Sequence, residues 1–234
     1  RFCKGAFTPE HKLARVTTHR NFSPILARDA VGINIRMSTP TKIVGEDDTV
    51  VDPNEVRLFV AAAADGCVDN VAKRLAFKLK KQRKIDRLRS IIKALNLDYK
   101  EYACSDGYKA IYIPLKELSE YLRQCKAPDV TQILGWTADA RAVFIDELRH
   151  WDGVFEDANI KFVTTNKAMA ETVLAVAASV GLLPRTTFTP RSQENPKWSD
   201  RYDVTIRRHD WVGVPSYAWG TQAFTGTVYC PTTE

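Results

Sequence analysis

The pattern of apolar and polar residues in the middle of this chain occurs twice. Leu75, Phe77 and Leu79 alternate with polar or small side chains, which is the period of a half-buried strand. The first copy then predicts a strand, a helix, two strands and a helix over residues 73–80, 85–95, 99–104, 108–113 and 115–125. The second copy predicts a strand, a helix and two strands over residues 159–164, 168–180, 185–189 and 201–208. Such self-similarity indicates two related structural units.

A short apolar helix that ends in Asp-Gly precedes each copy. The first spans residues 58–66 and contains four consecutive alanines, so another backbone can approach it closely. The second spans residues 145–153 and is bulkier, although it keeps an apolar stripe. If the two copies pack helix to helix, Asp65 and Asp152 meet at one end of the contact.

The residues at these helix ends suggest a metal site. We expect Gly66 and Gly153 to end the helices in a left-handed cap and to hold each acid at the helix base. Two carboxylates held close together repel one another unless cations lie between them, and carboxylate oxygens suit Mg²⁺ or Mn²⁺. Asp65, Asp152 and the two glycines are therefore the candidate metal residues. Metal-bound water would supply the nucleophile for phosphodiester hydrolysis.

The two Asp-Gly helices resemble those of the LAGLIDADG homing endonucleases, in particular the double-motif, single-chain type. The resemblance covers roughly residues 54–210 and is better in the first motif than in the second. It implies an α/β fold in which two pseudo-symmetric αββαββα halves, about 54–127 and 138–210, form a DNA-binding saddle. It also implies a metal-dependent endonuclease that acts on double-stranded DNA as a monomer, through its internal pseudo-dimer.

The same resemblance assigns roles to individual residues. In that family the acid before the final glycine binds Mg²⁺, and this acid maps to Asp65 and Asp152. A basic residue near the end of each half's last strand assists catalysis there. Lys116 and Arg207 are the nearest candidates in this sequence.

Strand alternation predicts which side chains would face DNA. When the apolar residues pack inward, the intervening basic and polar residues project from the opposite face, where they can contact phosphates and base edges. The candidate DNA-binding residues are Arg74, Lys78, Lys80, Arg201, Thr205 and Arg207. The plainer alternative is an ordinary solvated face, which charge runs usually form.

Composition adds modest support. The 234 residues carry a formal net charge of +6, and the sequence pI is about 9.0, which permits an anionic partner. The five cysteines show no C-x-x-C spacing, so we expect reduced thiols and an intracellular protein of a phage or microbial host. No apolar run approaches the roughly 20 residues of a membrane span, so we expect no membrane partner.

The ends of the chain lie outside the repeat and resemble the splicing (Hint-type) domain of inteins. Thr8-Pro9-Glu10-His11 is similar to the T-x-x-H block, in which His11 would polarise the splice junction and Thr8 would support it. Val228-Tyr229-Cys230 is similar to a strand near an intein's C-terminus. The resemblances together imply splicing segments at 1–50 and 223–234 around an endonuclease at 51–222. The printed chain has no nucleophile at Arg1 and no terminal His-Asn, so we do not expect it to splice.

Two other functions remain open. The repeat could bind nucleic acid without cutting it, as a maturase-like or regulatory protein, because its second helix departs from the small-residue pattern. The insert could also be a relic within a splicing element. Cleavage of the insert-free version of the host gene would distinguish the lead interpretation from both.

Overall fold

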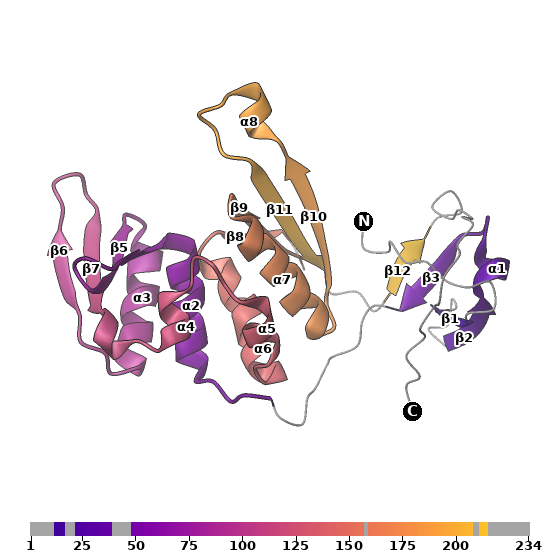
Figure 1. Ribbon diagram of the computed structural model, residues 1–234, viewed down its shortest axis with the longest axis horizontal. Helices are drawn as coiled ribbons and strands as arrows, with labels where there is room; N and C mark the ends of the chain where they lie inside the picture. The colour runs from indigo at the N-terminus through magenta and orange to yellow at the C-terminus, as the bar shows by residue number, and fades with distance from the viewer. Residues whose placement is uncertain (1–11, 17–21, 39–47, 157–158, 208–210, 215–234) are drawn as a thin grey trace. The chain divides into compact units, whose positions relative to one another are not determined.

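A computed structural model of the chain divides it into two compact units (Figure 1). One unit, the terminal unit, consists of Arg1–Thr39 and His209–Glu234, and the other, larger unit, the repeat unit, consists of Pro40–Arg208. The structure describes residues 12–16, 22–38, 48–156, 159–207 and 211–214. The splicing-related candidates Thr8, His11 and Cys230 lie outside these residues.

The terminal unit contains one antiparallel sheet built from both ends of the chain. Its strand order is β12-β3-β1-β2. The strands are β1 (Lys12–Val16), β2 (Phe22–Leu26), β3 (Ile35–Ser38) and β12 (Trp211–Val214), and the short helix α1 (Ala27–Ala30) follows β2. Leu13, Ala30 and Ile35 belong to a small core under this sheet. Because β12 pairs with β3 from Trp211↔Ser38 onward, the chain returns beside the strand it left.

The first half of the larger unit has the element order αββαββα. It consists of α2 (Pro53–Asp65), β4 (Gly66–Asp69), β5 (Arg74–Leu79), α3 (Gln82–Ala94), β6 (Lys100–Ala103), β7 (Lys109–Pro114), η1 (Leu115–Glu117) and α4 (Glu120–Arg123). The predicted helix over residues 115–125 is wrong as a single element. Leu118 is extended and only 4% exposed, so the break lets the chain bury Leu115, Leu118 and Leu122 together.

The second half follows α5 (Val130–Leu134) and repeats six of these elements. It consists of α6 (Ala138–Glu147) with η2 (Leu148–His150), β8 (Gly153–Glu156), β9 (Asn159–Thr164), α7 (Lys167–Ser179), β10 (Leu183–Thr189), α8 (Arg191–Glu194) and β11 (Arg201–Arg207). The short helix α8 lies in the connection between β10 and β11. The residues described after β11 belong to β12 of the terminal sheet.

The two halves share one sheet topology. Their strand orders are β4-β5-β7-β6 and β8-β9-β11-β10, so corresponding strands occupy corresponding places. The register agrees as well, because Gly66 pairs with Phe77 in one sheet and Gly153 with Phe162 in the other. The predicted repeat and its α/β fold class are therefore confirmed. Strands β4 and β8, which the alternation did not reveal, complete each sheet.

Helices cover one face of each sheet, and the predicted inward residues lie beneath them. Leu75, Phe77 and Leu79 are at most 4% exposed, whereas Lys78 between them is exposed. In β11, Val204 and Ile206 are likewise buried while Arg207 is exposed. The strand register inferred from the alternation is confirmed. One face of each sheet is thereby left free for polar contacts.

Helices α2 and α6 pack against each other and join the two halves (Figure 1). The ring of Phe59 in α2 is central to this contact. Its centroid lies 6.2 Å from that of Phe144, 5.8 Å from that of Trp136 and 6.0 Å from that of Tyr121. Clustered aromatic rings of this kind bury much area and fix the relative position of the helices.

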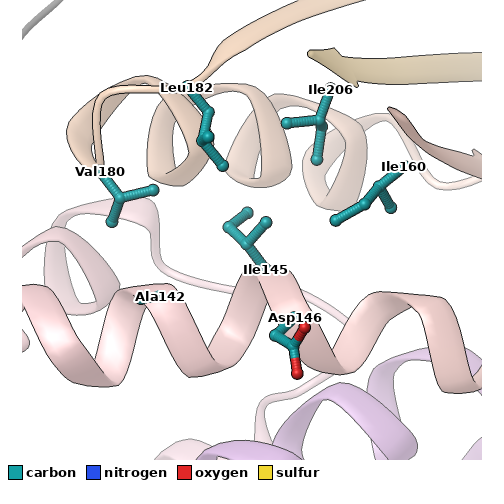
Figure 2. A pocket seen from close by; sticks show the side chains of 7 residues that line it. All are labelled: Ala142, Ile145, Asp146, Ile160, Val180, Leu182 and Ile206. Carbon is teal, nitrogen blue, oxygen red and sulfur yellow. The ribbon is translucent and has the colours of Figure 1, made fainter. Parts of the chain in front are cut away.

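The halves differ where the first one ends in α4. Tyr121 of α4 packs on α2 and donates a hydrogen bond to Glu55 Oε2 at 2.8 Å. The second half has a cavity of about 220 Å³ between α6, α7 and its sheet. Figure 2 shows Ile145 pointing from α6 towards Leu182 and Ile206, while the Asp146 carboxylate points away from them.

Candidate active site

The two predicted acids lie at one end of the α2–α6 contact. Asp65 is the last residue of α2. Asp152 follows the turn η2 at the end of α6 and directly precedes β8. Both carboxylates contact the same lysine ammonium, so they lie close together. The helix contact therefore brings together residues that are 87 positions apart.

The second acid is held differently from the first. The sequence predicted an α-helix that runs up to Asp152, but α6 ends at Glu147 and a 3₁₀ turn follows. Trp151 then turns inward, is 2% exposed and donates its indole N–H to Glu147 Oε1 at 2.9 Å. This large buried ring stands where the first motif has the small Ala64.

The glycines after the acids serve close packing and do not form left-handed caps. Gly66 has φ −80° and ψ 163°, and neither it nor Gly153 has positive φ, so that prediction is wrong. A Cβ at Gly66 would lie 2.7 Å from the Ala62 backbone, and one at Gly153 would lie 2.7 Å from Leu148 O. Each glycine lets its strand begin directly against the preceding helix, which fixes the acid at the junction.

Lys84 of α3 lies between the two acids, and sequence reasoning did not single it out. Its Nζ forms an ion pair with Asp65 Oδ2 and another, at 3.4 Å, with Asp152 Oδ1. Lys84 is only 8% exposed, and its Nζ lies 5.8 Å from the centre of the Trp151 ring. A signal was present, because Lys84 shares the apolar helix face of Leu88 and Ile91 at i+4 and i+7.

The electrostatic environment of the acids is uneven. Burial raises the pKa of Asp152, and the neighbouring Asp65 charge raises it further, while Lys84 opposes both effects. Lys126 adds a second positive charge and also lowers the pKa of Asp152. Its Nζ donates to Ala63 O at 2.7 Å, at the C-terminal end of α2, where a cation is favoured by the helix dipole.

A cavity of about 500 Å³ opens beside Asp152. Its lining includes Lys126, Asn166, Arg191 and Arg201. Asn166 fixes one wall, because it caps α7 and its side chain donates to Lys126 O at 2.7 Å. An acid pair next to a cavity with three basic side chains can receive an anionic group.

The buried carboxylate of Glu147 joins the elements that carry the two acids. Glu147 is 1% exposed and accepts hydrogen bonds from Arg87 of α3 and from the Trp151 indole. Its ion pair with Arg57 of α2, at 3.9 Å, adds a contact from the other helix. Glu147 thus ties α2, α3 and the segment before Asp152 together, which positions the acids.

The outer face of the first sheet combines basic and aromatic side chains. The Arg74 guanidinium lies 4.1 Å from the centre of the Tyr112 ring and forms an ion pair with Asp69. Lys78 and Lys80 lie 4.9 and 5.5 Å from the centre of the Tyr108 ring. These contacts arrange cations along one surface while leaving Lys78 and Lys80 exposed.

The outer face of the second sheet is also polar. Thr205 pairs with Lys161 on one side and with Arg185 on the other, so the three share this face. Arg201 forms an ion pair with Asp203 at 2.6 Å and also lines the cavity beside Asp152. Arg207 is exposed at the end of β11.

The assisting residue suggested for the first half is remote from these contacts. Lys116 lies in η1, its side chain is 81% exposed, and it pairs with Glu117 at 3.5 Å. The structure places Lys84 and Lys126 at the acids instead. The roles of Lys116 and Arg207 therefore stay predictions.

The donor set can be compared with what a divalent cation needs. Within the part of the chain that the structure describes, no three His, Cys, Asp or Glu side chains gather as a metal cluster. Mg²⁺, however, is commonly held by one or two carboxylates together with water and substrate phosphates. Asp65 and Asp152 satisfy this smaller requirement, and Lys84 supplies the positive charge between them in this structure.

Two further features of the described residues concern membrane spans and thiols. In the residues that the structure covers, no helix is both long enough and apolar enough to cross a membrane. Cys67, Cys104 and Cys125 are free thiols, and burial raises the pKa of Cys125 to about 11. A thiol with such a high pKa is unreactive at neutral pH.

The chain is similar to known proteins among the solved structures. No protein-family model and no curated protein matches the chain. Mesophilic variants of the homing endonuclease I-DmoI are 16% identical over 67% of this chain and 89% of theirs, with a TM-score of 0.44.

Two further structures match comparably. I-DmoI in complex with DNA and Ca is 16% identical over 67% of this chain and 83% of that one, with a TM-score of 0.45. The N-terminal LAGLIDADG domain of DUF199/WhiA is 14% identical over 67% of this chain and 77% of that one, with a TM-score of 0.42. None of these identities reaches 25%, so a function for this chain has to come from its own residues.

Proposed function

We propose that the repeat unit is a site-specific endonuclease that hydrolyses phosphodiester bonds of double-stranded DNA with Mg²⁺ or Mn²⁺. The observation that carries this proposal is the meeting of Asp65 and Asp152. They occupy corresponding positions in the two halves, and both contact Lys84 at the base of the helix contact. If Asp65 and Asp152 only marked the ends of two helices, nothing would require both to contact the same ammonium.

The surrounding residues suit an anionic substrate. Asp65 and Asp152 would hold the divalent cation, which would activate water and neutralise charge on the leaving oxygen. Lys126, Arg191 and Arg201 line the adjacent cavity and would attract the phosphate. Asn166 holds Lys126 through its backbone carbonyl and thereby keeps the cavity wall in place.

The decisive experiment uses the DNA that would have received the insert. The purified chain is incubated with the insert-free version of its host gene and Mg²⁺, and the products are mapped by sequencing. We expect one cut position, close to the insertion point, and no cutting when the metal is chelated. Uncut DNA at every metal concentration tested would remove the nuclease function.

A DNA-binding protein that no longer cuts is the second candidate. The specific observation in its favour is that Lys84 already compensates both carboxylates without a metal. The same incubation distinguishes the two, because this candidate predicts a retarded DNA band with intact strands.

The outer face of the first sheet gives a test of binding that does not depend on cleavage. We expect Lys78→Ala to weaken DNA binding and to reduce the slope of log K against log salt by about 1, because one phosphate contact is lost. Binding is measured by fluorescence anisotropy across a salt series. Lys93→Ala, on the exposed side of α3, is the matched control and should leave the slope unchanged. Equal slopes for wild type and Lys78→Ala would place DNA elsewhere.

We further propose that the terminal unit is part of an intein splicing domain into which the repeat unit is inserted. Strands β3 and β12 support this proposal, because Ser38 and Trp211 are directly paired although 172 residues separate them. The insert thus occupies the place of a hairpin turn. Loop tips of this kind tolerate domain insertion well.

This arrangement predicts that the insert is dispensable for folding of the terminal unit. Replacing residues 39–210 by Asn-Gly should give a two-residue hairpin between β3 and β12 and a folded protein. Dispersed amide signals in a ¹⁵N–¹H spectrum would show the fold. A spectrum typical of an unfolded chain would mean that the terminal unit depends on the repeat unit.

A further inference from the structure

Lys84 occupies the place that a divalent cation shared by the acids would need. Its ammonium contacts Asp65 Oδ2 and Asp152 Oδ1, one oxygen of each proposed metal ligand. The lysine is 8% exposed and comes from a third element, α3, so this is no incidental surface contact. The acid pair is thereby compensated by a group of the protein itself.

The position of Lys84 at the start of its helix is unfavourable for a positively charged side chain. It is the third residue of α3, in the first helical turn, where the helix dipole disfavours a positive charge. Burying an ammonium is costly unless carboxylates pair with it. The two acids offset both costs, which ties the folding of this helix start to the acid pair.

The charges at this point restrict what can bind at the same time. Asp65 and Asp152 carry two negative charges when ionised, and Lys84 offsets one of them. A divalent cation added beside the ammonium would leave an excess of positive charge in a partly buried space, and both cations would compete for the same oxygens. A phosphate group would restore the balance, since it brings negative charge of its own.

We propose that Lys84 is a built-in counter-ion of the acid pair, that a divalent cation binds only by displacing it, and that metal loading is therefore coupled to the arrival of the DNA phosphate. This inference rests on the proposed function for the identity of the metal site. Without DNA the protein holds the acids with Lys84 and binds metal weakly. With DNA the displaced ammonium gains a phosphate to pair with, and the metal binds tightly.

The first test measures metal binding and not activity. Mn²⁺ affinity of the full chain is determined by calorimetry for wild type and for Lys84→Met, which keeps an unbranched side chain one atom shorter than lysine and removes its charge. We expect Lys84→Met to bind Mn²⁺ roughly tenfold more tightly or better, because the competitor is gone. Lys81→Met, an exposed neighbour just before α3, should bind as wild type does. Unchanged or weaker binding by Lys84→Met would overturn the proposal.

The melting temperature gives a second readout. Lys84→Met should melt lower than wild type without metal, and Mn²⁺ should raise its melting temperature more than that of wild type, because the metal binds the folded state. If the variant does not fold, the wild type is titrated with Mg²⁺ while the lysine Nζ resonances are followed by NMR. Saturation with Mg²⁺ while the Lys84 Nζ signal is unmoved would refute displacement.

The failures of the two proposals are separable. If metal binds beside an unmoved Lys84 and DNA is cut, the displacement is wrong and the nuclease stands. If Lys84→Met gains affinity for Mn²⁺ but neither protein cuts the insert-free gene, the displacement stands and the nuclease does not. Absence of Mn²⁺ binding by both proteins, with and without DNA, overturns the displacement.

Discussion

Asp65→Asn should lower the rate of metal-dependent cleavage at least about 100-fold while leaving DNA binding largely intact. The amide removes a charged oxygen ligand from the proposed metal pair, and losing one such electrostatic partner lowers kcat by on the order of 100-fold to 1000-fold. DNA affinity should change by less than about tenfold, or roughly 1.4 kcal/mol, because the basic outer faces of the sheets are untouched. Cleavage is measured under single-turnover conditions, and binding is measured by anisotropy in Ca²⁺.

Asp152→Asn should also lower the cleavage rate while leaving DNA binding largely intact, and its effect on stability should depend on pH. Burial and the neighbouring Asp65 charge raise the pKa of Asp152, so ionising it costs more in the folded protein than in the unfolded chain. Stability from this group falls as pH rises from its unfolded pKa through its raised folded pKa. Asp152→Asn should therefore lose less stability at neutral pH than at acidic pH, relative to wild type.

A matched acid separates the site from a general charge effect. Asp98→Asn, at an exposed position after α3, removes the same charge and should cut at the wild-type rate. Normal cleavage by Asp65→Asn would remove Asp65 from the active site. Melting curves of all three variants check that the loss of cleavage does not follow from unfolding.

The sequence predicted the elements that have a strong period. Alternation identified β5 and β9, and helical spacing identified α3 and α7, since these elements pack one face on the core. Strands β4 and β8 escaped because each has four residues, begins with glycine and has too few side chains to show a period. Their place is set by pairing with β5 and β9 and by close contact with the preceding helix.

The sequence predicted the two acids of the candidate site but not the lysine that lies between them. Asp65 and Asp152 stand out because the repeat marks them twice. Lys84 is masked by the basic run that surrounds it, and only its spacing to Leu88 and Ile91 sets it apart from solvated neighbours. Which cation reaches the acids depends on how α3 of one half meets the end of α6 from the other, and no local pattern encodes that.

The role of Glu147 was likewise not predictable from the sequence, and its substitution is expected to cause the largest loss of stability. It corresponds to no acid of the first motif, yet it is 1% exposed and joins three elements. Arg87 Nε donates to its Oε1 at 3.0 Å, and Arg87 Nη2 donates to its Oε2, which makes a bidentate pair. This pairing raises the pKa of Arg87. A bidentate pair of this kind gives strong and directional hydrogen bonds.

Glu147→Ala should lower the free energy of unfolding of the repeat unit by about 3–5 kcal/mol, because breaking a buried pair leaves its partners uncompensated. Arg87 and the Trp151 indole would lose their hydrogen-bond acceptor, and Arg57 would lose an ion-pair partner. Urea unfolding followed by tryptophan fluorescence measures the change, since Trp136 and Trp151 are both buried. Asp146→Ala, one position earlier and half exposed, is the control and should stay within about 0.5 kcal/mol.

A second substitution separates charge from hydrogen bonding. Glu147→Gln keeps an oxygen that can accept from the Trp151 indole but removes the charge opposite Arg87, so its loss of stability should lie between those of Asp146→Ala and Glu147→Ala. Because Trp151 directly precedes Asp152, Glu147→Gln should also slow cleavage under conditions where the protein stays folded. A loss below about 1 kcal/mol in Glu147→Ala would show that the network contributes little to stability.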